Sequence, residues 1–273
     1  MTSKAVILAR GLGTRMQRPG GVALSDAGSD LAGRGLKVLM PVAGRPFVDY
    51  LADGLVRAGI RAVCFVVAPE AELMREHGSR IAAAAGIDVS YAVQEQPRGT
   101  ADAVLAACEF AGDEPFVLCN GDNVYPDSAL SRLAAAAGDE CWVVAFERDG
   151  LSSRGNIAPE RARDFSVVSA DAEGRLTGIV EKPEDPERFA RDGRLWLNMN
   201  LYRFTSDIFG ACADIEPDPR RGELELTAAV GLLVERGTTP FRVLECEDGV
   251  FDLTSRSDVP AAERALKERR LCF

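Results

Sequence analysis

Short apolar runs alternate with amphipathic stretches over roughly the first 145 residues, and this alternation constrains the fold more than any other feature. The apolar runs predict buried strands at 5–9, 63–67, 89–93, 116–119 and 142–146. The stretches between them predict helices at 46–58, 69–84, 99–110 and 127–137. Because alternating strands and helices form right-handed βαβ units, we expect an α/β fold of three layers around a mostly parallel, mixed sheet.

The pattern changes after residue 150. Strands are predicted at 165–169, 175–180, 196–204 and 241–245, and helices at 223–235 and 260–270. We interpret residues 151–273 as a smaller α+β half that packs on residues 1–150 and completes a cleft within one compact domain. The segment 17–36 is rich in Gly, Ser and Asp, which predicts a mobile loop or lid.

Charge and composition exclude several classes of function. The net charge is −10 and no run of Lys or Arg occurs, so nucleic-acid binding is not expected. The seven cysteines are scattered and never form a CxxC pair, which predicts buried free thiols in a reducing compartment. No signal sequence is evident and no apolar run reaches about 18 residues, so we expect a cytoplasmic protein that does not enter a membrane. The sequence leaves a homo-oligomer open.

The strand at 5–9 runs directly into a glycine-rich turn that contains Gly11 and Gly13. Glycines after a strand let backbone N–H groups converge on phosphate oxygens, and Arg15 adds a fixed fork of donors. A tight strand-to-helix turn with a surface arginine is the alternative. Lys37, which follows the segment 17–36, is either a further phosphate ligand or a solvated side chain.

Carboxylates and one histidine are further candidates. Asp122 ends the predicted strand at 116–119 after a glycine, where a carboxylate suits Mg²⁺. Asp127 is predicted to be the N-cap of the next helix and Asp258 a cap or turn residue of the last one. His77, the lone histidine, is predicted to be a helix cap or a surface residue, so histidine acid–base chemistry is not expected.

The segments LARGLGTRM (8–16) and KVLMPVAGRPFVDYL (37–51) strongly resemble the signature of sugar-1-phosphate nucleotidyltransferases. QEQPRGTADA (94–103), NGDN, SRGNI, EKP, LNMNLY, GELELT and VFDLTSRSD are similar to further family segments and follow in the family's order, so the resemblance covers residues 5–258. The resemblance implies a Rossmann-like nucleotide-diphospho-sugar transferase fold. It also implies that a nucleoside triphosphate and a hexose 1-phosphate form an NDP-sugar and pyrophosphate by Mg²⁺-assisted in-line attack on the α-phosphate.

The same resemblance assigns roles to individual residues. It implies that Arg15 and Lys37 are catalytic and that Asp122 and Asp252 hold the metal. The residues implied to bind the nucleotide are Leu8, Ala9, Arg10, Gly11, Gly13, Thr14, Gln94, Gly99 and Thr100. Those implied to bind the sugar phosphate are Asn123, Gly155, Glu181, Lys182 and Asn198.

The chain departs from the family pattern at several positions. Arg10 and Asn200 stand where Gly is usual, Val250 where Trp is usual, and Ala228 where Asp is usual. These departures leave the sugar and the nucleobase open, and two other functions with them. One is a catalytically silent nucleotidyltransferase-like sensor or regulatory subunit, and the other is a choline-phosphate-type cytidylyltransferase.

Overall fold

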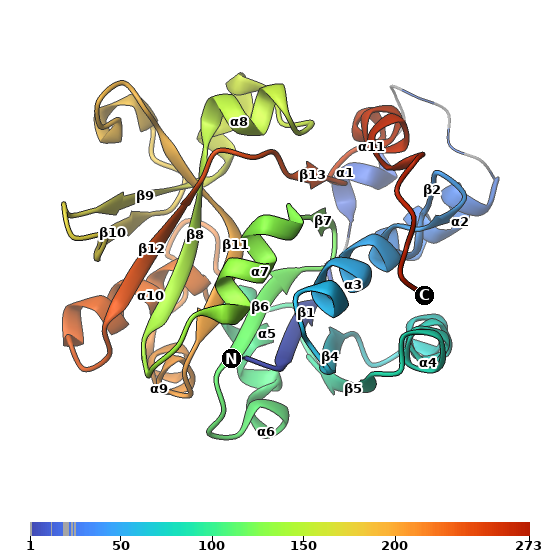
Figure 1. Ribbon diagram of the computed structural model, residues 1–273, viewed down its shortest axis with the longest axis horizontal. Helices are drawn as coiled ribbons and strands as arrows, with labels where there is room; N and C mark the ends of the chain where they lie inside the picture. Colours follow the sequence, from blue (N-terminus) through green and yellow to red (C-terminus); the bar gives the residue numbers. More distant parts are fainter. Residues whose placement is uncertain (1, 12, 19–21, 23, 25) are drawn as a thin grey trace.

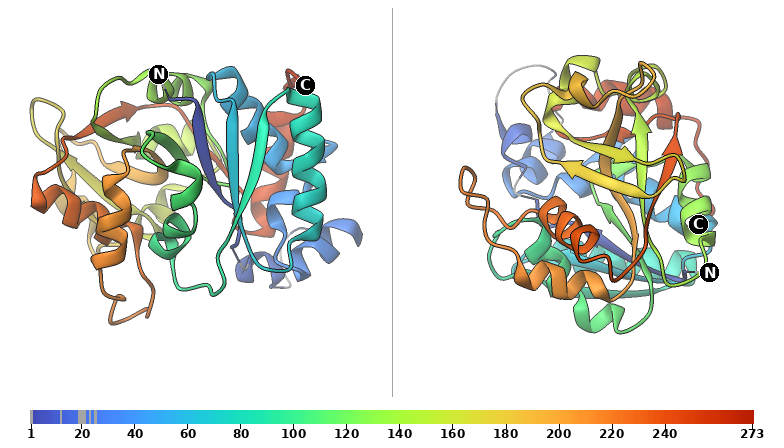
Figure 2. Two further views of the ribbon diagram at one scale, coloured as in Figure 1. Left: turned by 90° about the horizontal axis from the view of Figure 1, so that it is seen from below. Right: turned by 90° about the vertical axis from the view of Figure 1, so that its left-hand side faces the viewer.

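A computed structural model of the chain describes residues 2–11, 13–18, 22, 24 and 26–273. Within these residues a nine-stranded sheet runs in the order β10-β9-β11-β6-β1-β4-β5, and β8 lies on the other side of β11 and carries β12 at its free edge. Helices cover both faces of this sheet, so the molecule has three layers (Figures 1 and 2). The predicted α/β fold with a mixed sheet is confirmed.

The N-terminal part of the sheet is parallel. It contains β1 (Lys4–Leu8), β4 (Ala62–Val67), β5 (Asp88–Val93) and β6 (Phe116–Asn120), which confirm the predicted apolar strands. Leu8 pairs with both Val66 and Asn120, so the carboxyl ends of three strands are level at one edge. Ligands of open α/β sheets bind at this kind of edge.

Two hydrophobic clusters, one on each face, hold the helices to the sheet. α3 (Phe47–Arg57), α4 (Glu72–Ala85) and α7 (Asp127–Ala135) pack on one face. α5 (Thr100–Ala106), α9 (Asp207–Asp214) and α10 (Leu226–Arg236) pack on the other. The helix predicted at 99–110 is interrupted at Ala107, after which α6 (Cys108–Ala111) begins.

The C-terminal half extends the same sheet mostly in the antiparallel sense, although its last strand pairs with β8 in parallel. Its strands are β9 (Ser166–Ala170), β10 (Leu176–Val180), β11 (Trp196–Phe204) and β12 (Phe241–Cys246). β11 is antiparallel to β6 on one side and to β8 (Cys141–Glu147) on the other. The remaining helices are α8 (Arg148–Ser153) and α11 (Val259–Leu266). The backbone of the second half is therefore hydrogen-bonded directly to that of the first.

The prediction of one long loop at 17–36 is wrong for its second part. α1 (Thr14–Gln17) is followed by α2 (Asp26–Gly33), and residues 19–21, 23 and 25 lie outside the described residues. Ala32 is buried in a cluster with Met16, Met40 and Phe47, and Leu31 packs against it. Burial of this short apolar pair offsets the low helix propensity of the surrounding Gly, Ser and Asp residues. The 3₁₀ turn η1 (Lys37–Leu39) and the strands β2 (Pro41–Val42) and β3 (Arg45–Pro46) lead from there to α3.

Two predicted capping roles are also corrected. His77 lies in the middle of α4, and its Nε2 is 2.5 Å from Asp49 Oδ1 in a largely buried contact. Asp127 is the first residue of α7, with Pro126 as the N-cap, and it accepts a hydrogen bond from Arg269 at 2.7 Å. Asp258, in contrast, closes a capping box with Ser255 at the 3₁₀ turn η4 (Arg256–Asp258), so its predicted cap role is confirmed.

The cysteines are free thiols, as predicted; five of the seven are buried, and Cys108 and Cys272 are exposed. Among the helices of the described residues, none is long and apolar enough to cross a bilayer.

Candidate active site

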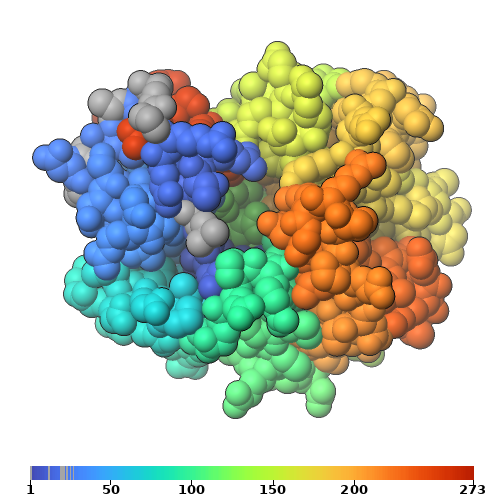
Figure 3. All heavy atoms as spheres, turned by 180° about the vertical axis from the view of Figure 1, so that it is seen from behind, coloured from blue at the N-terminus to red at the C-terminus, as the bar shows by residue number. Residues whose placement is uncertain are grey.

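A hollow opens at the carboxyl ends of the parallel strands. Figure 3 shows it on the face opposite to that of Figure 1, bordered by segments from both halves of the chain. It consists of two adjoining cavities. The turn cavity, of about 480 Å³, lies over the glycine turn and Gln94, and the β11 cavity, of about 330 Å³, lies over Asn198 and Glu181. Lys37, Thr100 and Asp122 line both cavities, so the two form one continuous cleft.

Every site residue predicted from the sequence lines one of the two cavities except Ala9 and Gly155. Ala9 is buried, and its N–H donates to Val66 O at 2.9 Å, so it fixes the end of β1. A Cβ on Gly155 would lie 2.6 Å from Leu151 O and closer still to Val250 O. Packing against the backbone of Val250 therefore accounts for Gly155. Gly155 does not line the cavity. Ser166 does, and its hydroxyl donates to Glu181.

The described residues of the glycine turn, Gly11 and Gly13, lie beside two cationic side chains. Gly13 has a φ of 60°, a left-handed conformation that glycine adopts without strain. The Lys37 side chain lies across the turn, since a Cβ on Gly11 would meet Lys37 Cε at 3.7 Å. Arg15 lies in the first turn of the short helix α1 and lines the β11 cavity. Arg15 and Lys37 thus bring two positive charges to the cavity beside Gly13.

Arg10 fixes the segment after β5. Its Nε donates to Gln94 O at 2.5 Å and its Nη2 donates to Glu95 O at 3.0 Å. The Gln94 side chain is fixed as well, because its Nε2 donates to Gly99 O at 3.0 Å and to Asp102 Oδ2 at 2.8 Å. The residue that departs most clearly from the family pattern therefore ties the end of β1 to the predicted base-recognition segment.

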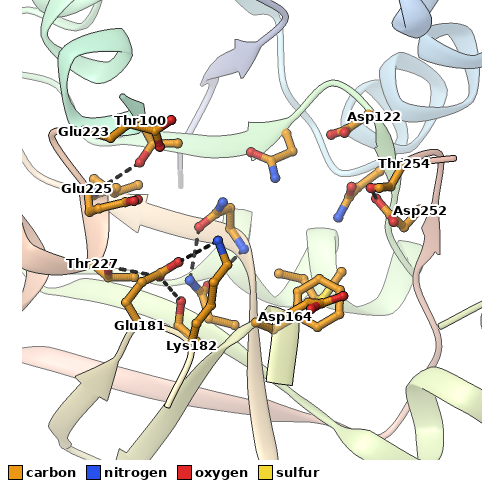
Figure 4. Close-up of a pocket in the computed structure, with 18 of the residues that line it drawn as sticks. Thr100, Asp122, Asp164, Glu181, Lys182, Glu223, Glu225, Thr227, Asp252 and Thr254 are labelled. Atoms are coloured by element: carbon orange, nitrogen blue, oxygen red, sulfur yellow. Dashed lines mark hydrogen bonds and ion pairs between the residues drawn. The ribbon is translucent and has the colours of Figure 1, made fainter. Parts of the chain in front are cut away.

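Two carboxylates from opposite halves meet beside this turn. β7 (Asn123–Val124) and β13 (Phe251–Asp252) form a two-stranded antiparallel ribbon in which Asp252 pairs with Asn123. With its amide turned to donate, Asn123 Nδ2 lies 3.3 Å from Asp122 Oδ1 and 3.2 Å from Asp252 Oδ1. Figure 4 shows Asp122, Thr254 and Asp252 together at one end of the pocket. The ribbon therefore turns both acidic side chains toward the same amide.

Each of these carboxylates has a cationic partner. Lys37 Nζ forms an ion pair with Asp122, and Arg161 Nη2 lies 2.9 Å from Asp252 Oδ2. Burial disfavours the Lys37 ammonium, but the charge and hydrogen bond of Asp122 outweigh it and raise the pKa of Lys37 above its ordinary value. Burial raises the pKa of Asp252 to about 6, the charge of Asp122 adds to this, and Arg161 and Thr254 oppose it. Asp252 is thus a desolvated carboxylate whose ionised form requires neighbouring positive charge.

The donor set suits a hard divalent cation. Asp122 and Asp252 offer carboxylate oxygens, and no cluster of three or more His, Cys, Asp or Glu side chains suited to a metal occurs among the described residues. A cation bound there would complete its shell with water and phosphate oxygens, which is the usual manner of Mg²⁺. The residues present therefore fit the metal that the sequence resemblance implies.

Glu181 organises the opposite end of the cleft. It accepts hydrogen bonds from Ser166 Oγ at 2.5 Å and from Thr227 Oγ1 at 3.2 Å, and Lys182 Nζ and Arg221 Nη1 each lie 3.2 Å from its Oε1. Figure 4 shows Glu181, Lys182 and Thr227 in this arrangement. Burial alone would raise the pKa of Glu181, but these hydrogen bonds and Lys182 lower it below its ordinary value. The side chain is an oriented, ionised hydrogen-bond acceptor.

Asn198 and Asn200 form the floor of the β11 cavity. Asn200 has a φ of 53° at an irregularity in the pairing of β11 with β8. Its N–H donates to Asn198 Oδ1 at 2.9 Å, and Asn198 Nδ2 donates to Asn200 Oδ1 at 3.0 Å. Asn tolerates the left-handed conformation better than most residues because its short side chain can hydrogen-bond locally, so this chain keeps the bend without a glycine.

Sequence reasoning missed two arginines of the cleft. Arg221 forms an ion pair with Glu181. Its Nη1 also lies 2.6 Å from Glu225 Oε1, but this second contact does not have the angles of a hydrogen bond. It directly precedes the GELELT segment, which could have indicated it. Arg161 lies in the 3₁₀ turn η2 (Pro159–Asp164), where no motif marks it.

Comparisons with known proteins point to one family. The family of nucleotidyl transferases matches residues 4–247. A glucose-1-phosphate thymidylyltransferase of Streptomyces antibioticus is 34% identical over 238 residues, which cover 86% of this chain and 58% of that protein. A UTP–glucose-1-phosphate uridylyltransferase of Haloferax volcanii is 29% identical over 269 residues, which cover 97% of each chain.

A solved structure described as UDP-glucose pyrophosphorylase complexed with UDP-glucose shares the fold. Its TM-score is 0.76 at 19% identity, over 98% of this chain and 100% of the other. The parallel strands, the glycine turn and the ribbon that joins Asn123 to Asp252 thus occur in a chain that matches one family over most of its length. The chain belongs to the nucleotidyl transferase family.

Proposed function

We propose that the chain is a sugar-1-phosphate nucleotidyltransferase, which converts a nucleoside triphosphate and a hexose 1-phosphate to an NDP-sugar and pyrophosphate. The observation that carries this proposal is the approach of Asp122 and Asp252 to the same amide beside the glycine turn. The chain spans 58% of the length of the Streptomyces relative, so the activity is inferred from the site and not transferred from that protein.

The turn cavity is the proposed nucleotide site. Backbone N–H groups around Gly11 and Gly13, with Arg15 and Lys37, suit the triphosphate because they offer many donors and two cations. The nucleobase would lie toward Gln94, Gly99 and Thr100, which line the far wall of that cavity. Leu8 and Arg10 line the wall at the end of β1 and would lie near the nucleoside.

The β11 cavity is the proposed sugar-phosphate site. Glu181, Asn198 and Asn123 offer polar groups to sugar hydroxyls, while Lys182 and Arg221 supply the positive charge that a phosphate needs. Sugar recognition of this kind rests on side chains whose orientation is fixed by other contacts. The four contacts of Glu181 and the paired amides of Asn198 and Asn200 meet that condition.

Asp122 and Asp252 would hold Mg²⁺, which supplies charge neutralisation at the phosphates when bound. In the reaction, an oxygen of the sugar phosphate forms a bond to the α-phosphorus, and the bond from that phosphorus to the bridging oxygen of pyrophosphate breaks. The attacking oxygen is already anionic near neutral pH, so no general base is required. Four cationic side chains of the cleft would bring the triphosphate and the sugar phosphate together and neutralise the negative charge that develops: Arg15, Lys37, Lys182 and Arg221.

A cytoplasmic location is part of the proposal, and it rests on the scattered, unpaired cysteines.

The test is a matrix of nucleoside triphosphates against sugar 1-phosphates, with pyrophosphate release as the readout. We expect turnover with at least one pair, and a loss of about 10²–10³-fold or more in Asp122→Asn and in Asp252→Asn. Asp127→Asn is the matched control, because Asp127 lies outside both cavities and binds Arg269. Nucleotide binding without any turnover would contradict the proposal and favour the silent sensor. Turnover only with CTP and choline phosphate would favour the cytidylyltransferase.

A further inference from the structure

Arg161 forms an ion pair with one carboxylate oxygen of Asp252, a proposed metal ligand. Its Nη2 lies 2.9 Å from Asp252 Oδ2, while Asp252 Oδ1 faces Asn123 and accepts from Thr254 Oγ1 at 3.0 Å. Asp252 thus offers Oδ1 toward Asp122 and has Oδ2 taken by a guanidinium. An arginine stays charged at every pH of interest, so the guanidinium is a fixed positive charge beside Asp252.

The turn that carries Arg161 holds the guanidinium in place. The guanidinium carbon lies 5.5 Å from the ring centre of Phe165, a cation–π distance. Asp258 Oδ1 lies 3.7 Å from Nη1, and Asp164 Oδ2 lies 3.9 Å from Nε. Asp258 is itself committed to the N–H groups of Thr254 and Ser255. The side chain is only 21% exposed, so Arg161 is fitted into the wall of the β11 cavity.

Arg161 and Lys37 together balance the charge of the two carboxylates. Lys37 pairs with Asp122 and Arg161 pairs with Asp252, so these four groups together carry no net charge, while Asp258 and Asp164 lie farther from Arg161, at 3.7 and 3.9 Å. A bare divalent cation entering there meets two anions and two fixed cations. In a low-dielectric site the repulsion from the cations largely offsets the attraction of the carboxylates. A metal ion already bound to a triphosphate carries the negative charge of the phosphates, so the complex is not repelled by the two fixed cations.

We propose that Arg161 is a positioning residue that keeps the empty metal site electrically balanced, so that the divalent metal binds together with the triphosphate and not before it. This inference rests on the proposed function, because it takes Asp122 and Asp252 as metal ligands. Arg161 leaves Asp252 Oδ1 as the single oxygen offered to the metal, and it suppresses uptake of metal without nucleotide.

The experiment measures Mn²⁺ binding by the full chain, with electron paramagnetic resonance of free Mn²⁺ as the readout. Each sample is compared with a protein-free sample at the same tripolyphosphate concentration, because tripolyphosphate itself chelates Mn²⁺. Wild type is expected to bind Mn²⁺ weakly on its own and at least about tenfold more tightly with tripolyphosphate, a probe that carries the phosphates without a base. Arg161→Gln is expected to bind Mn²⁺ alone about tenfold more tightly than wild type, because one fixed cation is lost. Arg161→Lys keeps the charge and is expected to stay close to wild type.

Arg163→Gln is the matched control, since Arg163 lies in the same turn, is exposed and donates a hydrogen bond to Glu160 O of that turn. Thermal unfolding of each variant checks that the fold is intact. The proposal is overturned if wild type binds Mn²⁺ alone as tightly as with tripolyphosphate, if Arg161→Gln matches Arg163→Gln, or if no arm binds Mn²⁺. Because the turnover matrix is measured separately, turnover with unchanged Mn²⁺ affinity in Arg161→Gln would refute this inference and leave the proposed function standing.

Discussion

Gly99 joins the two sides of the cleft, and its replacement by alanine is a severe test of the structure. Its φ is 126° at the start of α5, a backbone region that glycine adopts almost alone. A Cβ there would lie 2.6 Å from Leu224 N and closer to Leu224 O. Around this contact, Leu224 N donates to Arg98 O at 2.7 Å and Ala101 N donates to Leu224 O at 2.9 Å. A methyl group would force these two segments apart.

The expected cost follows from these contacts. The strained φ costs about 1–3 kcal/mol, and loss of two backbone hydrogen bonds costs about 1 kcal/mol each, so Gly99→Ala should destabilise the fold by about 3–5 kcal/mol. Glu223, next to Leu224, lines both cavities. We therefore expect the KM values for both substrates to rise together.

Urea unfolding and steady-state kinetics provide the measurements. Gly86→Ala is the control, because Gly86 has a φ of 64° and no atom within 4 Å of the added Cβ. Gly86→Ala should lower the free energy of unfolding only by the strain of the left-handed backbone, about 1–2 kcal/mol, and its KM values should be normal. If Gly99→Ala were no less stable than Gly86→Ala and bound both substrates normally, the contact with Leu224 would not constrain the cleft as argued.

Three further predictions concern single side chains. Lys37→Met should lower kcat by about 10²–10³-fold in the pyrophosphate assay, while Met in place of the exposed Lys267 should change little; equal effects would exclude Lys37 from the chemistry. Burial would raise the pKa of Asp53, but the hydrogen bonds from Arg57 and the Cys272 N–H lower it, so its carboxylate stabilises the fold above its ordinary pKa and loses this effect as pH falls through the depressed one. Asp53→Asn should therefore cost about 3–5 kcal/mol at pH 7 in urea unfolding, with the gap from wild type closing below about pH 4; a gap independent of pH would refute the charge argument. Asn200→Val should destabilise by about 1–2 kcal/mol at its φ of 53°, whereas Asn200→Gly should stay within about 0.5 kcal/mol, and equal melting of the two variants would contradict the backbone argument.

The main strands were predictable because each is a run of apolar residues with a clear boundary. β1, β4 and β6 are buried on both faces, and such runs are visible without any alignment. The ribbon of β7 and β13 was not predictable, since a two-residue strand has no periodicity and its partner lies more than a hundred residues away. α2 was missed because its composition is that of a loop, and only tertiary burial of Ala32 reveals it.

The site was predictable where motifs mark it and not elsewhere. Lys37, Asp122 and Glu181 stand in segments whose resemblance to a family is specific, and all of them line the cleft. Gly155 was assigned to the sugar from a short match, but the structure gives it a packing reason. Arg161 has no motif, because its position depends on how one short turn packs against Asp252.

The ribbon between β7 and β13 has a consequence for how the molecule matures. Asn123 and Asp252 are neighbours in space only after nearly all of the intervening chain has been made and has folded. Closing so long a loop is entropically costly, so this pairing should form late among the contacts of the fold. A growing polypeptide on the ribosome would then possess the glycine turn and its cations well before it could retain a metal ion. The ability to bind the metal would arise in a single late step, when the two strands of the ribbon pair.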